Sequence, residues 1–317
     1  MPRNALVRLA SPRLQMLLCL LALPLSALAQ NRPVEFLTTP LSGTVTMLSG
    51  SGGNVGISAG EDGVFIIDDQ VQPITDQLLA AIRKTSDKPI RFVINTHYHG
   101  DHVGGNEVIG GTGAIIIAHE NVYRRMSTEQ FSKFMNETTP PWPAGALPVI
   151  TFSDHVTLQF NGEAATVYHV ANGHTDGDAI IYFPVSNVIH TGDIYFNGLY
   201  PFIDLDGGGT LQGMLAAVEF ALTLTNEDTR IIPGHGPLAS VNDLASYRDF
   251  LVEARDKVQV LIDRGKSLEE TISATPTAKW DATLGQTWIT PAQMVTFIYN
   301  SLKGVTEYTP VPANTSK

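Results

Sequence analysis

Short apolar runs separated by polar and glycine-rich segments dominate the first 240 residues of the chain. In the first half of this region, runs typical of buried strands lie at 44–48, 64–68, 90–95 and 114–118. Between the second and third runs, apolar residues recur at Ile74, Leu78 and Ile82, which is the spacing of one helix face. This order of elements predicts a mixed α/β domain.

The second half of this region repeats the arrangement. Further strand-like runs lie at 156–160, 164–170, 179–183, 187–189 and 230–232. A helical pattern from Leu211 to about Leu224 precedes the last of these runs. The pattern by itself predicts no more than a mixture of strands and helices.

The pattern beyond residue 239 is helical. From 240 to 264, Leu244, Tyr247 and Leu251 share an apolar face, which predicts one long packed helix. Two shorter helices are predicted at 266–273 and 291–302. The resulting division is a main domain at 30–239, C-terminal helices packing on it at 240–305, and a polar tail at 306–317.

Residues 1–29 have the pattern of a secretory signal peptide. Three arginines precede an apolar stretch at 14–28, and small residues around Ala29 suit cleavage there. Pro24 interrupts the stretch, which is shorter than the ~20 residues that a membrane-spanning helix needs. We therefore expect a periplasmic or secreted protein with no stable membrane insertion.

The net charge and the cysteine content exclude several classes of partner and of catalytic chemistry. Removing residues 1–29 takes the formal charge from −11 to −14, because the segment holds three arginines and no acidic residue. An acidic protein without a basic stripe is a poor partner for nucleic acid. The only cysteine, Cys19, lies in the same segment, so structural disulfides, a thiol nucleophile and a cysteine metal ligand are all excluded from the mature chain.

The strongest chemical signal follows the apolar run at 90–94. His97, His99, Asp101 and His102 lie within six residues, beside Gly100, whose backbone can turn freely. Imidazole and carboxylate groups are ligands suited to zinc, and also to iron or manganese. Four ligands so close in sequence are unsuited to one tetrahedral ion, so the cluster predicts further ligands downstream or two metals.

Three further ligand candidates each follow a short apolar run and lie beside glycine, as strand-end loops do. They are His174 in Gly-His-Thr-Asp-Gly-Asp, Asp193 in Thr-Gly-Asp, and His235 in Pro-Gly-His-Gly.

With these motifs the chain resembles the metallo-β-lactamase superfamily, from about Leu48 to His235. The HxHxDH motif corresponds to 97–102, the GHTxGD motif to 173–178, and the later aspartate and histidine to Asp193 and His235. The resemblance implies an αββα sandwich in which metal-binding loops from both halves meet at one edge.

The resemblance also implies roles for individual residues. The ligands implied for one metal are His97, His99 and His174. Those implied for the other are Asp101, His102 and His235, with Asp193 bridging both. Asp68, at the end of an apolar run, matches a family aspartate that supports the histidine loop.

Two zinc ions would lower the pKa of a shared water from ~16 towards ~7 and so supply hydroxide at neutral pH. Asp101 would orient this nucleophile as a catalytic residue as well as bind metal. We therefore expect an acyl hydrolase acting on a small-molecule ester, lactone, thioester or β-lactam.

Several alternatives stay open. Zinc β-lactamases of this superfamily typically lack an aspartate at the position of Asp193, which favours the lactonase and glyoxalase II branches, whereas export favours a β-lactamase in the strict sense. A mononuclear iron oxygenase acting on persulfides is a further alternative within the superfamily. The phosphodiesterase and ribonuclease branches are disfavoured by the export signal and the lack of a basic stripe. A non-catalytic scaffold is least favoured, because no expected ligand is missing.

Two insertions are candidates for contact with substrate. The segment 123–148 combines a predicted amphipathic helix, containing Phe131 and Phe134, with a proline-rich stretch around Trp142. The segment 195–209 follows Asp193 directly and is rich in aromatic residues and glycine. The residues predicted to line a substrate pocket are Trp142, Tyr195, Tyr200 and Phe202. Ordinary packing is the competing explanation for both segments.

Overall fold

The computed structural model describes residues 34–309, which belong to one compact unit. The predicted signal peptide and residues 310–317 of the predicted tail lie outside the described residues. Among the described residues, no helix combines the length and the hydrophobicity needed to cross a bilayer.

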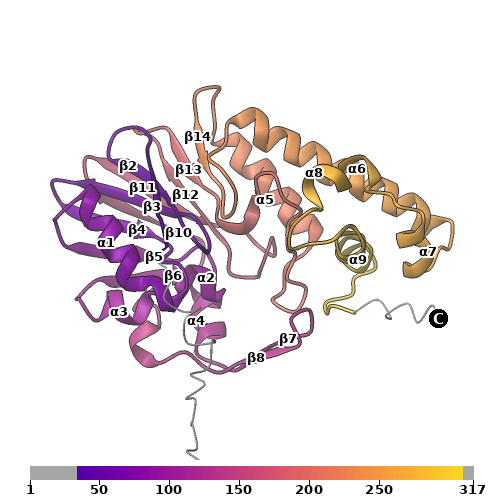
Figure 1. Ribbon diagram of the computed structural model, residues 1–317, viewed down its shortest axis with the longest axis horizontal. Coiled ribbons are helices and arrows are strands. Elements are labelled where there is room, and N and C mark those ends of the chain that lie inside the picture. The colour runs from indigo at the N-terminus through magenta and orange to yellow at the C-terminus, as the bar shows by residue number, and fades with distance from the viewer. Residues whose placement is uncertain (1–33, 310–317) are drawn as a thin grey trace, which may run out of the picture. The chain divides into compact units, whose positions relative to one another are not determined.

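A first sheet of seven strands contains the first half of the chain (Figure 1). Its first four strands pair antiparallel, and the last four pair parallel. In spatial order the strands are β1 (Leu37–Pro40), β2 (Val45–Ser49), β3 (Val55–Gly60), β4 (Gly63–Ile67), β5 (Ile90–Ile94), β6 (Ile115–His119) and β9 (Ile150–Phe152). The pattern of apolar runs identified β2, β4, β5 and β6 but missed the others.

A second sheet of five strands contains the second half. The strands are β10 (His155–Phe160), β11 (Glu163–His169), β12 (Ala179–Phe183), β13 (Val188–His190) and β14 (Arg230–Ile232). The first four pair antiparallel, and β14 joins β13 in parallel after a helical crossover. All five strands were predicted.

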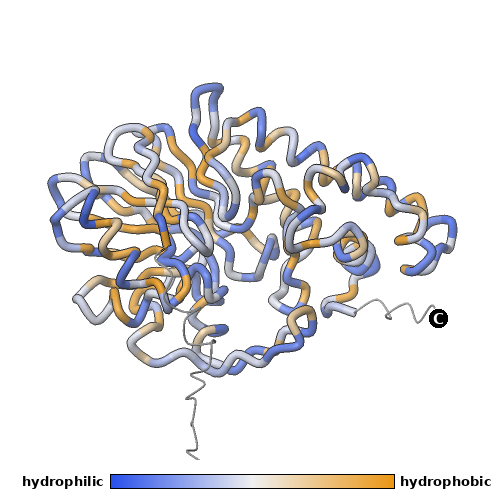
Figure 2. The backbone as a smooth tube through the Cα atoms, viewed as in Figure 1, coloured by the Kyte–Doolittle hydropathy of each residue, from blue (hydrophilic) through white to orange (hydrophobic). Residues whose placement is uncertain are grey.

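The two sheets pack face to face, and alternate residues of a strand serve different cores. In β4, Phe65 and Ile67 point into the core between the sheets, where Phe65 stacks on Phe183 of β12 at 5.6 Å. Val64 and Ile66 point to the opposite face, where they pack against α1 (Thr75–Thr85). Figure 2 shows the resulting concentration of hydrophobic residues along the strands. A strand buried on both faces explains the continuous apolar run.

Helices cover the outer face of each sheet, which confirms the αββα sandwich. The second sheet is covered by α5 (Leu211–Thr223), α6 (Val241–Asp263) and α9 (Pro291–Leu302), so the C-terminal helices share its core. The remaining helices are α2 (Gly100–Val103), α3 (Asn106–Gly110), α4 (Glu120–Met126), α7 (Leu268–Ser273) and α8 (Ala278–Leu284).

The amphipathic helix predicted in the segment 123–148 is wrong beyond Met126. There α4 ends, and the chain forms a hairpin of β7 (Gln130–Ser132) and β8 (Glu137–Thr139). Asn136 turns the hairpin with a φ of 52°. Phe134 leaves the hairpin to pack against Phe202, Phe297 and other aromatic rings, so tertiary contacts override the helical spacing.

Residues 306–309 of the predicted polar tail are described, and one of them packs against the fold. Tyr308 is buried beside Phe134 and Phe297, and its backbone N–H donates to Asp206. One aromatic ring therefore anchors the start of this segment to the fold.

Candidate metal centre

The histidine loop follows β5 and is held from below by Asp68. This buried carboxylate accepts hydrogen bonds from the Thr96 backbone N–H at 2.7 Å and the Thr96 hydroxyl at 2.8 Å. Its Oδ2 also lies 2.7 Å from His102 Nδ1. Asp68 adopts a φ of 62°, a backbone conformation that is costly for this residue type and is concentrated at functional sites. These contacts are compatible with the supporting role predicted for Asp68, which stays a prediction.

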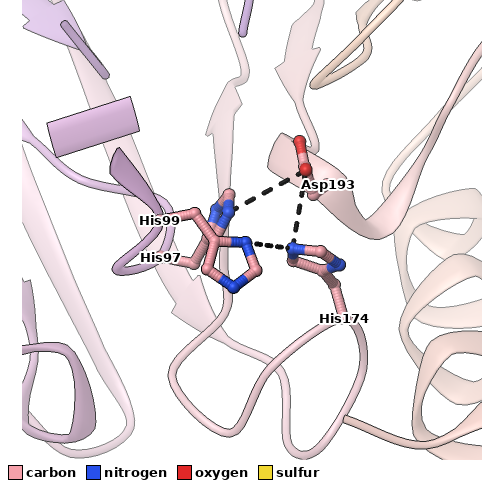
Figure 3. Close-up of side chains that lie close together, drawn as sticks. All are labelled: His97, His99, His174 and Asp193. Atoms are coloured by element: carbon pink, nitrogen blue, oxygen red, sulfur yellow. Dashed lines mark hydrogen bonds and ion pairs between the residues drawn. The ribbon is translucent and has the colours of Figure 1, made fainter. Parts of the chain in front are cut away.

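Four ligand-type side chains from three loops meet as a first group: His97, His99, His174 and Asp193 (Figure 3). One ligand atom of each lies within 4.8 Å of the others. His99 Nδ1 lies 2.9 Å from His174 Nε2, and Asp193 Oδ2 lies 3.5 Å from the same nitrogen. The loop after β5, the β11–β12 loop and the turn after β13 therefore converge on one point.

A second group consists of Asp101, His102 and His235. Asp101 Oδ2 lies 3.6 Å from His102 Nε2 and 3.3 Å from His235 Nε2. Asp193 also reaches this group, with Oδ1 3.2 Å from His102 and Oδ2 3.4 Å from His235. Asp193 thus lies between the two groups, as a bridging ligand must.

The unpaired atoms at the centre fit a metal. His97 Nε2, His102 Nε2 and Asp193 Oδ1 are buried and form no hydrogen bond among the described residues. Buried polar atoms without partners are rare in native proteins, since each costs desolvation energy. Nitrogen and carboxylate donors aimed at common points are the ligand set of zinc, and also suit iron or manganese.

The electrostatics of the first group also favour a cation. Burial lowers the pKa of His97 well below its usual range and the pKa of His174 to about 4, so both imidazoles are neutral, as metal ligands must be. Burial opposes the charge of Asp193, but the imidazoles of His235 and His102 outweigh it and hold its pKa well below the usual range.

The histidines of the second group bind protons more tightly than His97 and His174 do. Burial opposes protonation of His235, yet Asp193 and Asp101 outweigh it and raise the pKa of His235 to about 9. The pKa of His102 is raised for the same reason, against its burial. A metal at the second group would therefore compete with protons, and its affinity would rise with pH.

Hydrogen bonds behind the imidazoles orient them towards the centre. Asp204 Oδ2 lies 2.9 Å from His99 Nε2 and accepts from the Tyr98 hydroxyl at 2.6 Å. His174 Nδ1 donates to the Phe202 carbonyl at 2.7 Å. Such partners fix which ring nitrogen faces a metal. No motif in the sequence marks Asp204 as part of the centre, although it lies in the segment 195–209.

A glycine-rich loop at 50–54, which was not among the predicted site segments, closes the centre from the side of the second group. A Cβ on Gly53 would overlap the His102 ring, and one on Gly52 would lie 2.9 Å from Asp101 Cβ. Gln70 holds the loop by accepting from the Gly52 N–H at 2.6 Å and donating to the Gly53 carbonyl. Only glycine, which has no side chain, lets the backbone pass this close to His102 and Asp101.

The predicted pocket residues separate into two pairs. Phe202 lines a cavity of about 240 Å³ beside His99 and Asp101, and Trp142 lines an adjoining hollow. Tyr195 and Tyr200 instead lie in the core beneath α6, against Tyr247 and Phe250 respectively. Their placement in the pocket is corrected accordingly: their rings fill the space between the 195–209 segment and α6.

The layered sheets and the order of the ligand motifs define one class of fold. Comparison with known proteins leads to the same class. The family model of the metallo-beta-lactamase superfamily matches residues 48–235, more than half of the chain. The protein belongs to this superfamily.

Two curated relatives have different activities in their names. A metallo-beta-lactamase type 2 from Bacillus sp. (strain 170) is 21% identical over 178 residues, covering 56% of this chain and 64% of the relative. A hydroxyacylglutathione hydrolase from Polaromonas sp. (strain JS666 / ATCC BAA-500) is 27% identical over 168 residues, covering 52% and 56%. The chain thus spans less than two thirds of either relative.

Solved structures share the fold at low sequence identity. A metallo-beta-lactamase from Pontibacter korlensis aligns with a TM-score of 0.56 and 19% identity, covering 68% of this chain and 99% of that chain. The stereoselective inverting sec-alkylsulfatase Pisa1 from Pseudomonas sp. aligns with a TM-score of 0.63 and 16% identity, covering 88% of this chain and 52% of that chain. The second alignment extends beyond the residues that match the family model.

Proposed function

We propose that this protein is an exported, dinuclear zinc-dependent hydrolase that opens an acyl bond in a small molecule, an ester, lactone, thioester or β-lactam. One observation carries the proposal: two groups of ligand-type side chains converge, and Asp193 lies between them. The names of the two curated relatives, a β-lactamase and a thioester hydrolase, support an acyl bond as the target.

When bound, two zinc ions would supply a water of lowered pKa and a Lewis acid for the substrate carbonyl. The protein's own side chains would hold the ligands and the attacking water in position. Asp193 would hold both groups in register, and Asp101, which lines the cavity, would orient the attacking water by accepting a hydrogen bond from it. Asp204 and Asp68 would keep His99 and His102 turned towards the centre.

The choice of substrate is open between branches of the family. Asp193 supports the lactonase and glyoxalase II branches, while the predicted signal peptide at 1–29 supports contact with β-lactams outside the cytoplasm. Iron in place of zinc would support the persulfide oxygenase instead.

The test combines metal analysis of the protein as purified with initial rates of hydrolysis by the zinc-loaded protein. The zinc-loaded protein is given 4-nitrophenyl acetate, a γ-lactone, an acyl thioester and a chromogenic cephalosporin, beside a His99→Ala control. We expect two zinc ions per chain and ester, lactone or thioester cleavage that is lost in the control. Cephalosporin turnover above the others would identify a strict β-lactamase. One iron per chain with no hydrolysis would overturn the proposal.

Export is tested separately. Fractionation of cells that produce the full chain is expected to place it outside the cytoplasm, with a new N-terminus at about Gln30. An intact N-terminus in the cytoplasmic fraction would contradict this part of the proposal.

A further inference from the structure

An apolar wall leads from the candidate metal centre towards the surface. The ring of Phe202 stacks on His99 with centroids 5.9 Å apart. On its other sides it contacts Trp288 at 5.1 Å and Phe134 at 4.9 Å. A molecule reacting beside His99 would therefore meet aromatic surface on its way out of the cavity.

The rim of the same cavity carries exposed apolar side chains from two segments. Phe131 and Met135 come from the β7–β8 hairpin, and Trp288 comes from the α8–α9 loop. Their exposed fractions are 53%, 48% and 49%. Apolar residues scattered singly on a surface need no explanation, but three that line one cavity mark a contact surface for a ligand.

Among the described residues, no side chain supplies the outer part of the cavity with an unpaired positive charge that could hold an anion. Arg125 is the only lysine or arginine among the described residues that line it. Its guanidinium is already paired with Asp176 through two hydrogen bonds of 2.8 Å. Glu137 and Asp206 also line the cavity, so its outer part is acidic as well as apolar.

The hairpin that forms much of this rim is held in place. Asp206 accepts hydrogen bonds from the backbone N–H groups of Lys133 at 2.8 Å and Tyr308 at 3.1 Å. Phe134 packs between Phe202 and Phe297. A preorganised apolar surface binds a matching group without the entropy cost of ordering the rim.

We propose that the arm of the substrate that occupies this cavity is an uncharged alkyl or aryl group, and that an arm ending in a carboxylate is rejected. Burial on Phe131, Met135 and Trp288 provides affinity, and a carboxylate there would lose water without gaining a cation. The identity of the bond that reacts rests on the proposed function, whereas the preference for an uncharged apolar arm does not.

The test measures binding, so it does not require turnover. Calorimetry on the zinc-loaded protein compares acetohydroxamate, octanohydroxamate and the eight-carbon hydroxamate with a terminal carboxylate. Each buried methylene contributes about a fourfold gain in affinity. We expect the octanoyl compound to bind at least about thirtyfold more tightly than the acetyl compound, and the carboxylate to remove most of that gain. Equal affinity for all three, or preference for the carboxylate, would overturn the inference.

Three variants locate the effect. Trp288→Ala should reduce the advantage of octanoyl over acetyl about tenfold, whereas Val185→Ala, equally apolar and 75% exposed on the β12–β13 turn, should preserve it. Met135→Lys should improve binding of the terminal carboxylate relative to octanohydroxamate, because it adds the missing cation at an exposed position. Unchanged selectivity in both rim variants would contradict the placement of the arm.

The two proposals fail separately. Selective binding by a protein that hydrolyses no acyl substrate would overturn the proposed function and leave the apolar arm in place. Acyl hydrolysis without any dependence on chain length would do the reverse.

Discussion

At the scale of single residues, the centre depends on carboxylates that contact imidazoles from behind. Asp204 contacts His99, and Asp68 contacts His102. Both carboxylates are buried and bonded to other donors as well, so they hold the rings in one orientation. A ring held in this way presents the same nitrogen to a metal at all times.

Replacing Asp204 should weaken metal binding. We expect Asp204→Asn to lower zinc affinity about tenfold, because the partner that orients His99 loses its charge. Competition with a fluorescent chelator measures the change. The matched control is Asp281→Asn, in which another tyrosine-bonded aspartate, the partner of Tyr200, is changed away from the centre. An equal loss in both variants would refute an orienting role.

A second residue prediction concerns acid stability. His119 Nδ1 accepts from the Asn121 N–H at the start of α4, and the ring stacks on His169 with centroids 3.6 Å apart. Burial and His169 lower the pKa of His119 below its usual value. A histidine with a lowered folded-state pKa favours unfolding as pH falls, so stability is lost below about pH 6.5.

Urea unfolding at pH 7 and pH 5 measures this effect. We expect the free energy of unfolding to fall less in His119→Asn, which keeps a neutral cap, than in the natural protein. His155→Asn, which alters an exposed histidine away from the start of α4, is the matched control. An identical fall in all three proteins would disprove the prediction.

At the scale of elements, the β7–β8 hairpin is held by contacts outside itself. Its two strands are three residues each, too short to be stable alone. Phe134 contributes the main packing, against Phe202, Phe297 and Tyr308. The rim of the cavity therefore depends on an aromatic cluster that includes residues from the C-terminal region.

Removing that anchor should loosen the hairpin. In Phe134→Ala we expect amides of the hairpin to exchange with solvent at least about tenfold faster, while amides of β12 stay protected. The loss in overall stability should be below the ~3–5 kcal/mol typical of a fully buried phenylalanine, since Phe134 is partly exposed. Phe131→Ala, on the same hairpin but mostly exposed, is the control and should change exchange little.

At the scale of the whole molecule, the candidate centre joins the two halves of the sandwich. His97 and His99 follow β5 of the first sheet, whereas His174, Asp193 and His235 follow strands of the second. A metal bound here would connect both halves in the folded state only, and so stabilise it by mass action.

Metal removal should therefore lower the thermal midpoint. Zinc at about a thousand times its Kd adds about 4 kcal/mol, which corresponds to roughly 8–16 °C for a domain of ~150–250 residues. Calorimetry with and without a chelator measures the shift. Asp193→Asn removes the bridging carboxylate and should show a much smaller shift; a full shift in this variant would exclude binding at the proposed centre.

How much of the fold was predictable depended on the local signal of each element. Strands buried on both faces, such as β4 and β12, are continuous apolar runs and were predicted. The missed strands carry weak signals: β1 ends in Pro40 and is mostly exposed, β3 contains two glycines, and β9 has three residues. Pairing with a neighbouring strand decides such segments, and a pattern of apolar positions does not record which strands pair.

The sequence by itself determined the superfamily, the layered α/β fold and the residue types of the centre, because apolar periodicity and the histidine and aspartate motifs are local properties. The assignment of each ligand to a metal stays a prediction, although the fold brings these side chains together. Only the tertiary structure placed Asp204 behind His99, moved Tyr195 and Tyr200 into the core, and turned the segment after α4 into a hairpin. Those outcomes depend on contacts between residues far apart in the chain, which no local pattern records.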